Sequence, residues 1–251
     1  MTGVQTCALP ISGKAGTGKS TLLRLLRHAT DRNIAVVAPT GLAALNVQGQ
    51  TIHSLFKFPT HFLTAQDVPK YQLEERQFFE KLETLVIDEV SMVRSDLFQA
   101  IDIALRKARG RKKKHLPFGG VQVVLFGDLY QLPPVVTTAD EPHIQKAFGT
   151  EFFFHAPSFR SGAFHAVELS RPFRQADPEF LRLLNAVRHG QMGSADMAQL
   201  NAYTVPKPGN VIPAGQPEPI LLVGTNAQAD THNTARLAAI DAPTETFTGR
   251  I

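Results

Sequence analysis

A glycine-rich segment near the start of the chain places the strongest constraint on the fold. Residues 13–20 read GKAGTGKS and fit the pattern G-x-x-x-x-G-K-[ST] without a mismatch, and a helical stretch at 19–28 follows directly. Glycines at these spacings let several backbone N–H groups point at phosphate oxygens, and the N-terminal end of the helix favours the same negative charge. The segment therefore predicts a nucleotide-binding loop between a buried strand and a helix.

The residues of this loop have separate expected roles. Lys19 should reach the β- and γ-phosphates, and the Ser20 hydroxyl should bind Mg²⁺. Thr21 should lie beside the phosphates at the start of the helix. The residues expected to hold ATP are Gly13, Ala15, Gly16, Thr17, Gly18, Lys19, Ser20 and Thr21.

The first two-thirds of the chain alternate short β-branched runs with helical stretches. Near-continuous apolar runs suit strands that are buried on both faces of a parallel sheet, so the fold class is α/β with flanking helices. A proline-rich stretch at 205–219 then predicts a linker or domain boundary. Strands are expected at 34–38, 84–87, 121–126 and 220–223, and helices at 19–28, 41–47, 74–81, 95–109, 178–189 and 227–240.

Composition excludes several other classes of protein. The chain has 251 residues, 43% of them hydrophobic, which is enough for one large domain or two modest ones. No stretch reaches the roughly 18 apolar residues of a membrane span, so no membrane partner is expected. A single cysteine excludes a disulfide framework, and a cytoplasmic location is therefore expected. The formal net charge of +4 is compatible with a polyanionic partner.

Polar residues follow two of the expected strands. Asp88 and Glu89 end the apolar run at 85–87, and Gln131 lies a few residues after the run at 121–126. The carboxyl ends of parallel strands meet at one edge of a sheet, where ligands bind. We expect Asp88 to hold Mg²⁺, Glu89 to polarise the attacking water, and Gln131 to hydrogen-bond the γ-phosphate or that water.

The segment ahead of the loop does not resemble the buried strand that such a loop needs. Pro10 lacks the N–H that a central strand donates, and the alternation of apolar residues is poor. The sequence TGVQTCALPI also resembles the translation of a sequencing-library adapter. Residues 1–11 are therefore expected to be an artefact in place of the native first strand, the alternative being a real but irregular strand.

Five blocks of sequence stand in a distinctive order along the chain: residues 13–21, 38–56, 86–93, 126–135 and 168–190. This order is similar to that of superfamily-1 DNA helicases. The blocks resemble most the RecD-like and Pif-type branch, which moves 5′ to 3′ on DNA. The resemblance implies a first RecA-like motor domain at 12–165 with a wedge-like insertion at about 57–80. It also implies a connecting helical segment at 166–204 and the start of a second RecA-like domain at 205–251.

The resemblance also implies roles for single residues. Arg174 matches the family arginine that reaches from the second motor lobe toward the γ-phosphate, so it joins Glu89 and Gln131 as a catalytic candidate. Similar helicases contact single-stranded DNA through the loop after the second strand and through a later segment. These matches make Pro39, Thr40 and His53 the DNA-binding candidates, although a buried His53 that ties a loop is the alternative.

Two groups of residues allow either a structural or a functional interpretation. Phe56, Phe58 and Phe62 are more often core residues than platforms for DNA bases. Residues 106–114, RKARGRKKK, contain seven basic side chains in nine, which suit a grip on phosphates or simply a solvated helix end.

The expected function is the motor core of an ATP-dependent 5′–3′ DNA helicase acting on single-stranded DNA and on single/double-strand junctions. The alternatives are a P-loop ATPase of another class, such as a nucleotide kinase or signalling GTPase, and a DNA-binding fragment that does not unwind. The motifs that close the second lobe do not occur before Ile251. Little or no unwinding is therefore expected from residues 1–251.

Overall fold

The computed structural model describes residues 8–160, 165–202, 220–243 and 245. The chain divides into two units, residues 1–192 and 193–251, and each is described by itself. None of the helices in these described ranges combines the length and apolar character needed to cross a membrane.

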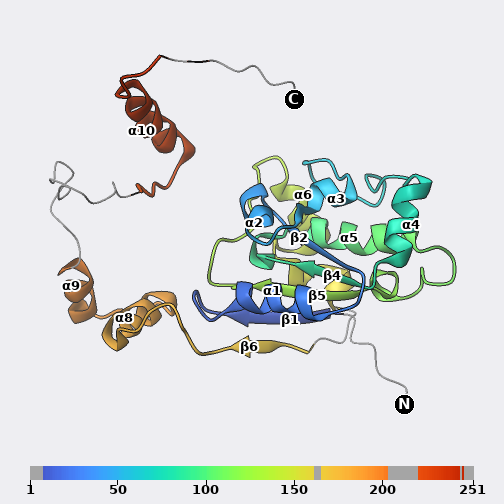
Figure 1. Cartoon of the computed structure of the whole chain (residues 1–251), viewed down its shortest axis with the longest axis horizontal. Helices are drawn as coiled ribbons and strands as arrows, with labels where there is room; N and C mark the ends of the chain where they lie inside the picture. The colour runs from blue at the N-terminus through green and yellow to red at the C-terminus, as the bar shows by residue number, and fades with distance from the viewer. Residues whose placement is uncertain (1–7, 161–164, 203–219, 244, 246–251) are drawn as a thin grey trace. The chain divides into compact units, whose positions relative to one another are not determined.

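A six-stranded parallel sheet forms the centre of the first unit, with the strand order β3-β2-β4-β5-β1-β6 (Figure 1). The expected strands at 34–38 and 84–87 have the bounds that the sequence predicts, and the third begins and ends one residue later. The strands are β1 (Ala8–Gly13), β2 (Ile34–Ala38), β3 (Gln50–Thr51), β4 (Thr84–Ile87), β5 (Gln122–Gly127) and β6 (Val167–Leu169).

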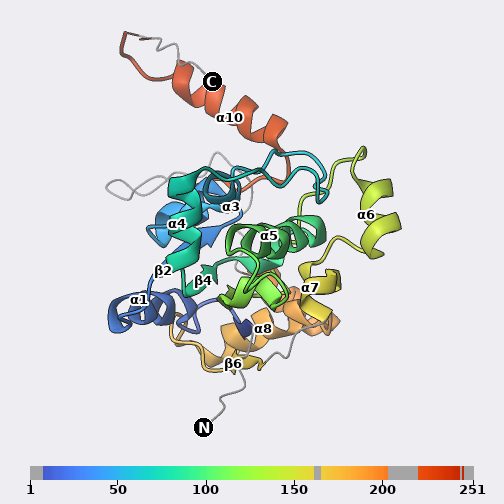
Figure 2. The same ribbon diagram turned by 90° about the vertical axis from the view of Figure 1, so that its right-hand side faces the viewer.

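Helices connect these strands (Figure 2). Each predicted helix is present, with ends within two residues of the expected ones. The first unit contains α1 (Lys19–Ala29), α2 (Gly41–Asn46), α3 (Ile52–Phe56), α4 (Leu73–Lys81), α5 (Ser95–Ala108), α6 (Glu141–Phe148), α7 (Pro157–Arg160) and α8 (Pro178–Arg188). The second unit contains α9 (Ser194–Ala202) and α10 (Asn226–Ala238).

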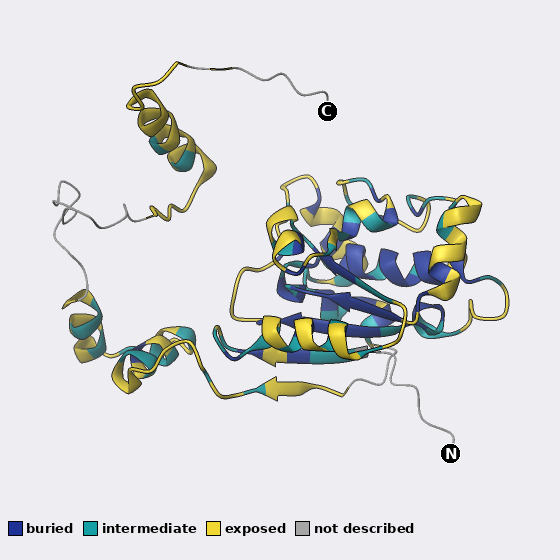
Figure 3. Ribbon diagram, viewed as in Figure 1, coloured by how far each residue is buried: buried dark blue, intermediate teal, exposed yellow. Residues whose placement is uncertain are grey.

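The sheet is buried on both faces. In β4, Leu85 and Ile87 pack into one apolar core with α5, while Val86 packs into a second core with Leu23 of α1. Successive side chains of a strand point to opposite faces, so this division places α5 and α1 on opposite sides of the sheet. Figure 3 shows α5 buried over most of its length and α1 exposed on its outer face. These two layers hold the strand ends in fixed positions.

Within the described residues, one expected strand is absent, and a strand that the sequence left open as an alternative is present. The segment at 220–223 is not paired with any strand in the described residues, and Ile220 and Leu222 are exposed, so an apolar run alone does not make a strand. Conversely, β1 does form from Ala8 onward and pairs with β5 and β6. Its pairing with β6 begins at Ile11, so Pro10 has a described strand partner on one side only, where a missing N–H is tolerated. The sequencing origin of residues 1–11 stays a prediction.

Candidate functional site

The topology gathers the predicted site residues at one edge of the sheet. The glycine-rich loop follows β1, Asp88 and Glu89 follow β4, and Gln131 follows β5. These three strands are neighbours in the sheet and run parallel, so their carboxyl ends lie together. Loops at the carboxyl ends of parallel strands are where open α/β sheets bind ligands.

The glycine-rich loop wraps around the lysine side chain. Gly16 and Gly18 have φ angles of 77° and 91°, a left-handed conformation that glycine adopts without steric cost. The Lys19 ammonium donates hydrogen bonds to the carbonyl oxygens of Gly13 at 2.6 Å and Lys14 at 3.1 Å. Burial lowers the pKa of Lys19, against the opposing charges of Asp128, Glu89 and Asp88. The ammonium therefore lies inside the loop and close to three carboxylates.

A cavity of about 420 Å³ opens beside this loop. It is large enough for a small ligand such as a nucleotide. Six of the eight predicted ATP-binding residues line it, together with all three catalytic candidates and Phe173. The lining is Ala15, Gly16, Gly18, Lys19, Ser20, Thr21, Glu89, Gln131, Phe173 and Arg174.

Gly13 and Thr17 support the loop from behind instead of lining the cavity. Thr17 is buried, and its hydroxyl donates to the carbonyl oxygen of Lys14 at 2.8 Å. A Cβ atom at Gly13 would lie 2.5 Å from the Thr17 hydroxyl, so only glycine fits there. These two residues set the shape of the loop through packing and backbone conformation.

Asp88 and Glu89 form an acidic pair whose negative charge is only partly compensated by nearby positive charge. Burial raises the pKa of Asp88, and burial together with the charge of Asp88 raises the pKa of Glu89; in both cases Lys19 partly offsets the rise. Glu89 also has a φ angle of 49°, which is uncommon for a residue with a side chain. A divalent cation would relieve the repulsion within this pair, and the carboxylate of Asp88 and the hydroxyl of Ser20 are ligand types that Mg²⁺ accepts.

Gln131 is held by a carboxylate that sequence reasoning missed. Its side-chain amide donates to Asp128 at 3.1 Å, and the backbone N–H of Tyr130 donates to the same carboxylate at 3.1 Å. Asp128 is almost fully buried. Asp128 comes directly after β5, just as Asp88 comes directly after β4. This position after an apolar strand is the sequence feature that could have identified it.

Arg188 of α8 is the second missed residue. Its guanidinium donates two hydrogen bonds of 2.6 Å to the two oxygens of Asp128 and lies 4.3 Å from the centre of the Tyr130 ring. Burial acts to raise the pKa of Asp128, but the hydrogen bonds and charge of Arg188, together with the hydrogen bonds from Tyr130 and Gln131, outweigh it and hold that pKa below its usual value. The same helix reaches the glycine-rich loop through Asn185, which accepts a hydrogen bond of 2.7 Å from Lys14.

Arg174 lies against the glycine-rich loop. The backbone N–H of the preceding residue, Phe173, donates to the carbonyl oxygen of Gly16 at 2.8 Å. A Cβ atom at Gly16 would lie only 2.6 Å from the Cβ of Arg174. Both residues belong to the first unit, and the side chain of Arg174 lines the cavity.

The DNA-binding candidates lie at the same edge of the sheet. Ala38 of β2 pairs with Thr51 of β3, so the segments containing Pro39, Thr40 and His53 leave the sheet side by side. The Thr40 hydroxyl caps α2 by accepting from the N–H of Ala43 at 3.3 Å. His53 is half-buried, and burial followed by the charge of Arg94 lowers its pKa. A role of these residues in binding DNA stays a prediction.

The phenylalanines divide between the two interpretations. Phe56 and Phe58 are buried and stack at 5.3 Å, which confirms that they belong to the core. Phe62 is partly buried and stacks on His143 at 5.4 Å. It therefore already has a partner among the described residues.

Comparisons with known proteins agree with this geometry. A family described as PIF1-like helicase matches residues 4–197. The chain belongs to the PIF1-like helicase family. It is 36% identical over 249 residues to the ATP-dependent DNA helicase PIF1 of Emericella nidulans, which covers 94% of this chain and 31% of that protein. It is also 36% identical over 201 residues to the human protein of the same name, covering 79% of this chain and 30% of that protein.

Solved PIF1 structures share the fold. The Bacteroides Pif1 helicase in complex with ADP-AlF3 and ssDNA matches 98% of this chain and 58% of its own, at 35% identity and a TM-score of 0.85. The Candida albicans Pif1 helicase matches 95% of this chain and 52% of its own, at 30% identity and a TM-score of 0.78. The predicted RecA-like sheet and the Pif-type resemblance are thus confirmed. The chain spans about a third of the length of the curated relatives.

Proposed function

We propose that this chain is the ATP-dependent motor core of a DNA helicase, in which ATP hydrolysis is coupled to 5′–3′ movement along single-stranded DNA. The supporting observation is a single cavity that is lined by the glycine-rich loop and by Glu89, Gln131 and Arg174. A loop of this type serves many kinds of nucleotide enzyme. Membership of the PIF1-like family favours the helicase motor over a nucleotide kinase or signalling GTPase.

The residues of the cavity suggest how the reaction would proceed. Backbone N–H groups of the loop and Lys19 would hold the phosphates, and Arg174 would stabilise the charge that develops on the γ-phosphate. Glu89 would accept hydrogen bonding from the attacking water, and the Gln131 amide would orient that water or the γ-phosphate. Mg²⁺, when bound by Ser20 and Asp88, would neutralise part of the phosphate charge.

DNA would bind near the ends of β2 and β3. Thr40 and the N-terminal N–H groups of α2 suit a phosphate, while Pro39 and His53 offer surfaces for a sugar or base. A similar structure is of Bacteroides Pif1 bound to ssDNA, and another concerns DNA unwinding at forked dsDNA by two coordinating Pif1 helicases. Single-stranded DNA and strand junctions are therefore the proposed partners.

ATP hydrolysis by the purified chain, with and without single-stranded DNA, tests this function. We expect stimulation by DNA and its loss in Glu89→Gln, with nucleotide binding retained. Glu74→Gln, at an exposed position in α4, is the control and should hydrolyse ATP normally. An equal rate of hydrolysis with and without DNA would favour a P-loop ATPase of another class.

Strand separation is a separate matter. The chain covers 31% of the length of the Emericella relative, and hydrolysis-driven stepping requires two lobes that close and reopen. We propose that residues 1–251 alone unwind little or no DNA. A forked duplex with a fluorescent strand tests this, and efficient strand release by the purified chain would contradict it.

A further inference from the structure

The basic run at 106–114 contains two kinds of side chain. Three of its cations have partners within the protein: Arg106 pairs with Asp102 at 2.8 Å, and Lys107 donates to the carbonyl oxygen of Ala65 at 2.8 Å. Arg109 is buried and donates to the carbonyl oxygens of Phe79 and Leu82 near the end of α4. These three cations are accounted for by the fold.

The other four cations are exposed and unpaired. The side chains of residues 111–114 form no hydrogen bond or ion pair with any residue that the structure describes, and we name them the cation turn: Arg111, Lys112, Lys113 and Lys114. Four neighbouring positive charges repel one another, so folding alone gives no reason to gather them. Their number equals the formal net charge of the whole chain, +4.

The backbone of the cation turn is folded. The N–H groups of Lys113 and Lys114 donate to the carbonyl oxygen of Gly110 at 3.2 and 3.1 Å, and that of Leu116 donates to Lys113 at 3.0 Å. Gly110 has a φ angle of 74°, which permits the chain to turn sharply after α5. The four charges are therefore presented on a defined turn and not on an extended tail.

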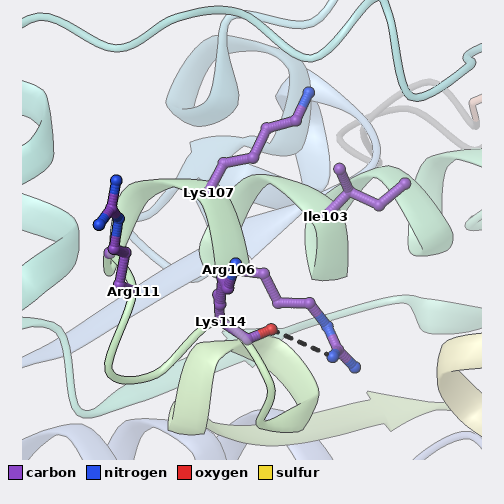
Figure 4. Close-up of a pocket in the computed structure, with 6 residues that line it drawn as sticks. Ile103, Arg106, Lys107, Arg111 and Lys114 are labelled. Atoms are coloured by element: carbon purple, nitrogen blue, oxygen red, sulfur yellow. Dashed lines mark hydrogen bonds between the residues drawn. The ribbon is translucent and has the colours of Figure 1, made fainter.

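A cavity of about 320 Å³ lies beside the turn. Ile103, Arg106, Lys107, Gly110, Arg111 and Lys114 line it. Figure 4 shows the side chains of Lys107 and Arg111 extending away from the helix end, while Arg106 turns toward the carbonyl oxygen of Lys114. Four basic residues thus contribute to the lining of this cavity.

The turn lies away from the nucleotide cavity. α5 follows the carboxyl end of β4 and leads back to the start of β5, so residues 109–121 lie at the amino edge of the sheet. The glycine-rich loop and the DNA-binding candidates lie at the carboxyl edge. A ligand on the cation turn would therefore be held at a different place from ATP or the proposed single strand.

We propose that the cation turn binds the phosphate backbone of duplex DNA, as a second contact beyond the single-strand site. Regularly spaced phosphates match a cluster of lysine and arginine side chains, and such contacts need no particular base sequence. Single strands are usually held by stacking on aromatic rings as well. Phe118, the one phenylalanine, tyrosine or tryptophan among residues 110–121, is fully buried, and the exposed ring beside the turn is the smaller imidazole of His115. The limited stacking surface favours duplex over single-stranded DNA. The choice of DNA as the polyanion rests on the proposed function.

The test measures the affinity of the whole 251-residue chain for a blunt duplex, without ATP, over a series of salt concentrations. The variant replaces the whole cation turn with glutamine: Arg111→Gln, Lys112→Gln, Lys113→Gln and Lys114→Gln. A matched control removes the same charge at dispersed exposed positions outside the expected wedge-like insertion: Arg24→Gln, Lys81→Gln, Lys146→Gln and Arg236→Gln. Both variants have the same net charge, so a difference between them depends on position.

Four phosphate contacts give a slope of log affinity against log salt of about −3.6, or about a hundredfold loss of affinity between about 50 and about 200 mM salt. We expect the slope to flatten by about 3 in the cation-turn variant and by less than about 1 in the control. Equal slopes in the two variants would overturn the proposal. A second result would also overturn it: the cation-turn variant loses tight binding of polyglutamate but binds the duplex as the parent chain does. That result would indicate an acidic protein as the partner.

ATP hydrolysis stimulated by single-stranded DNA is measured on the same variants. It should stay unchanged in the cation-turn variant, because the turn lies outside the nucleotide cavity. Loss of the duplex contact with intact stimulation would support the proposal. Normal duplex binding by a chain that fails to hydrolyse ATP would count against the proposed motor function but not against the duplex contact.

Discussion

Replacing Arg188 by methionine should destabilise the first unit by about 3 kcal/mol at neutral pH. Removing one partner of a buried ion pair costs about 3–5 kcal/mol, because the remaining charge is left without compensation. The side chain of Asp128 is 1% exposed and that of Arg188 is 18% exposed. Two donors, the N–H of Tyr130 and the amide of Gln131, remain on the carboxylate after the change. The cost should therefore lie at the lower end of that range.

Urea denaturation followed by circular dichroism measures this cost. The double variant Asp128→Asn, Arg188→Met also removes the carboxylate charge that Arg188→Met leaves unpaired. It should be more stable than Arg188→Met alone by about 2 kcal/mol, which is the size of coupling energy found for contacting residues. Arg182→Met is the matched control on the same helix. Its ion pair with Glu179 is about half exposed and is expected to contribute no more than about 0.5 kcal/mol.

The pH dependence gives a second measurement of the same pair. Arg188 holds the pKa of Asp128 below its ordinary value, so the stabilisation is present above about pH 3.9 and is lost as the pH falls through the lowered pKa. In Arg188→Met, burial is opposed by the hydrogen bonds from Tyr130 and Gln131 but no longer by Arg188, so the pKa of Asp128 rises and the carboxyl takes up its proton at a higher pH. The difference between variant and parent should therefore be largest near pH 7 and shrink toward pH 4. A cost below about 1 kcal/mol at pH 7, or one that does not change with pH, would refute the reasoning.

Three further predictions concern the nucleotide and DNA sites. Arg174→Ala should lower ATP hydrolysis by about 10³-fold while nucleotide affinity, measured by titration calorimetry, changes far less. Gly16→Ala should weaken nucleotide binding and lower the midpoint of thermal unfolding, because its φ angle is 77° and the new methyl group would meet the Cβ of Arg174. His53→Ala should weaken single-stranded DNA binding, measured by fluorescence anisotropy, by about tenfold without changing DNA-independent hydrolysis.

The nucleotide site was largely predictable because its signals are local. The loop motif predicts the roles of Lys19 and Ser20. An apolar strand that is followed by Asp88 and Glu89 predicts that these carboxylates lie at the carboxyl edge of a parallel sheet. The parallel topology then brings separate strand ends together, so six of the eight predicted loop residues line the cavity with Glu89, Gln131 and Arg174. Local patterns and one general rule of sheet topology were sufficient here.

The pairing of Asp128 with Arg188 could not be predicted in the same way. The two residues are 60 positions apart, and no spacing pattern in the sequence predicts that they are in contact. The β1 strand was missed for a related reason. Pro10 conflicts with a central strand in isolation, but its acceptability depends on where β6 begins to pair, and that is decided by residues more than 150 positions later. Long-range pairing settles both cases.

The contacts of α8 connect the two halves of the cavity. Asn185 holds Lys14 in the glycine-rich loop, and Arg188 holds Asp128, which in turn holds Gln131. Asn185 and Arg188 are three residues apart and so lie on the same side of one helix. A small displacement of α8 would therefore lengthen both sets of hydrogen bonds at once. The rigid helix thereby makes the position of the Gln131 amide depend on the same element that fixes the phosphate loop.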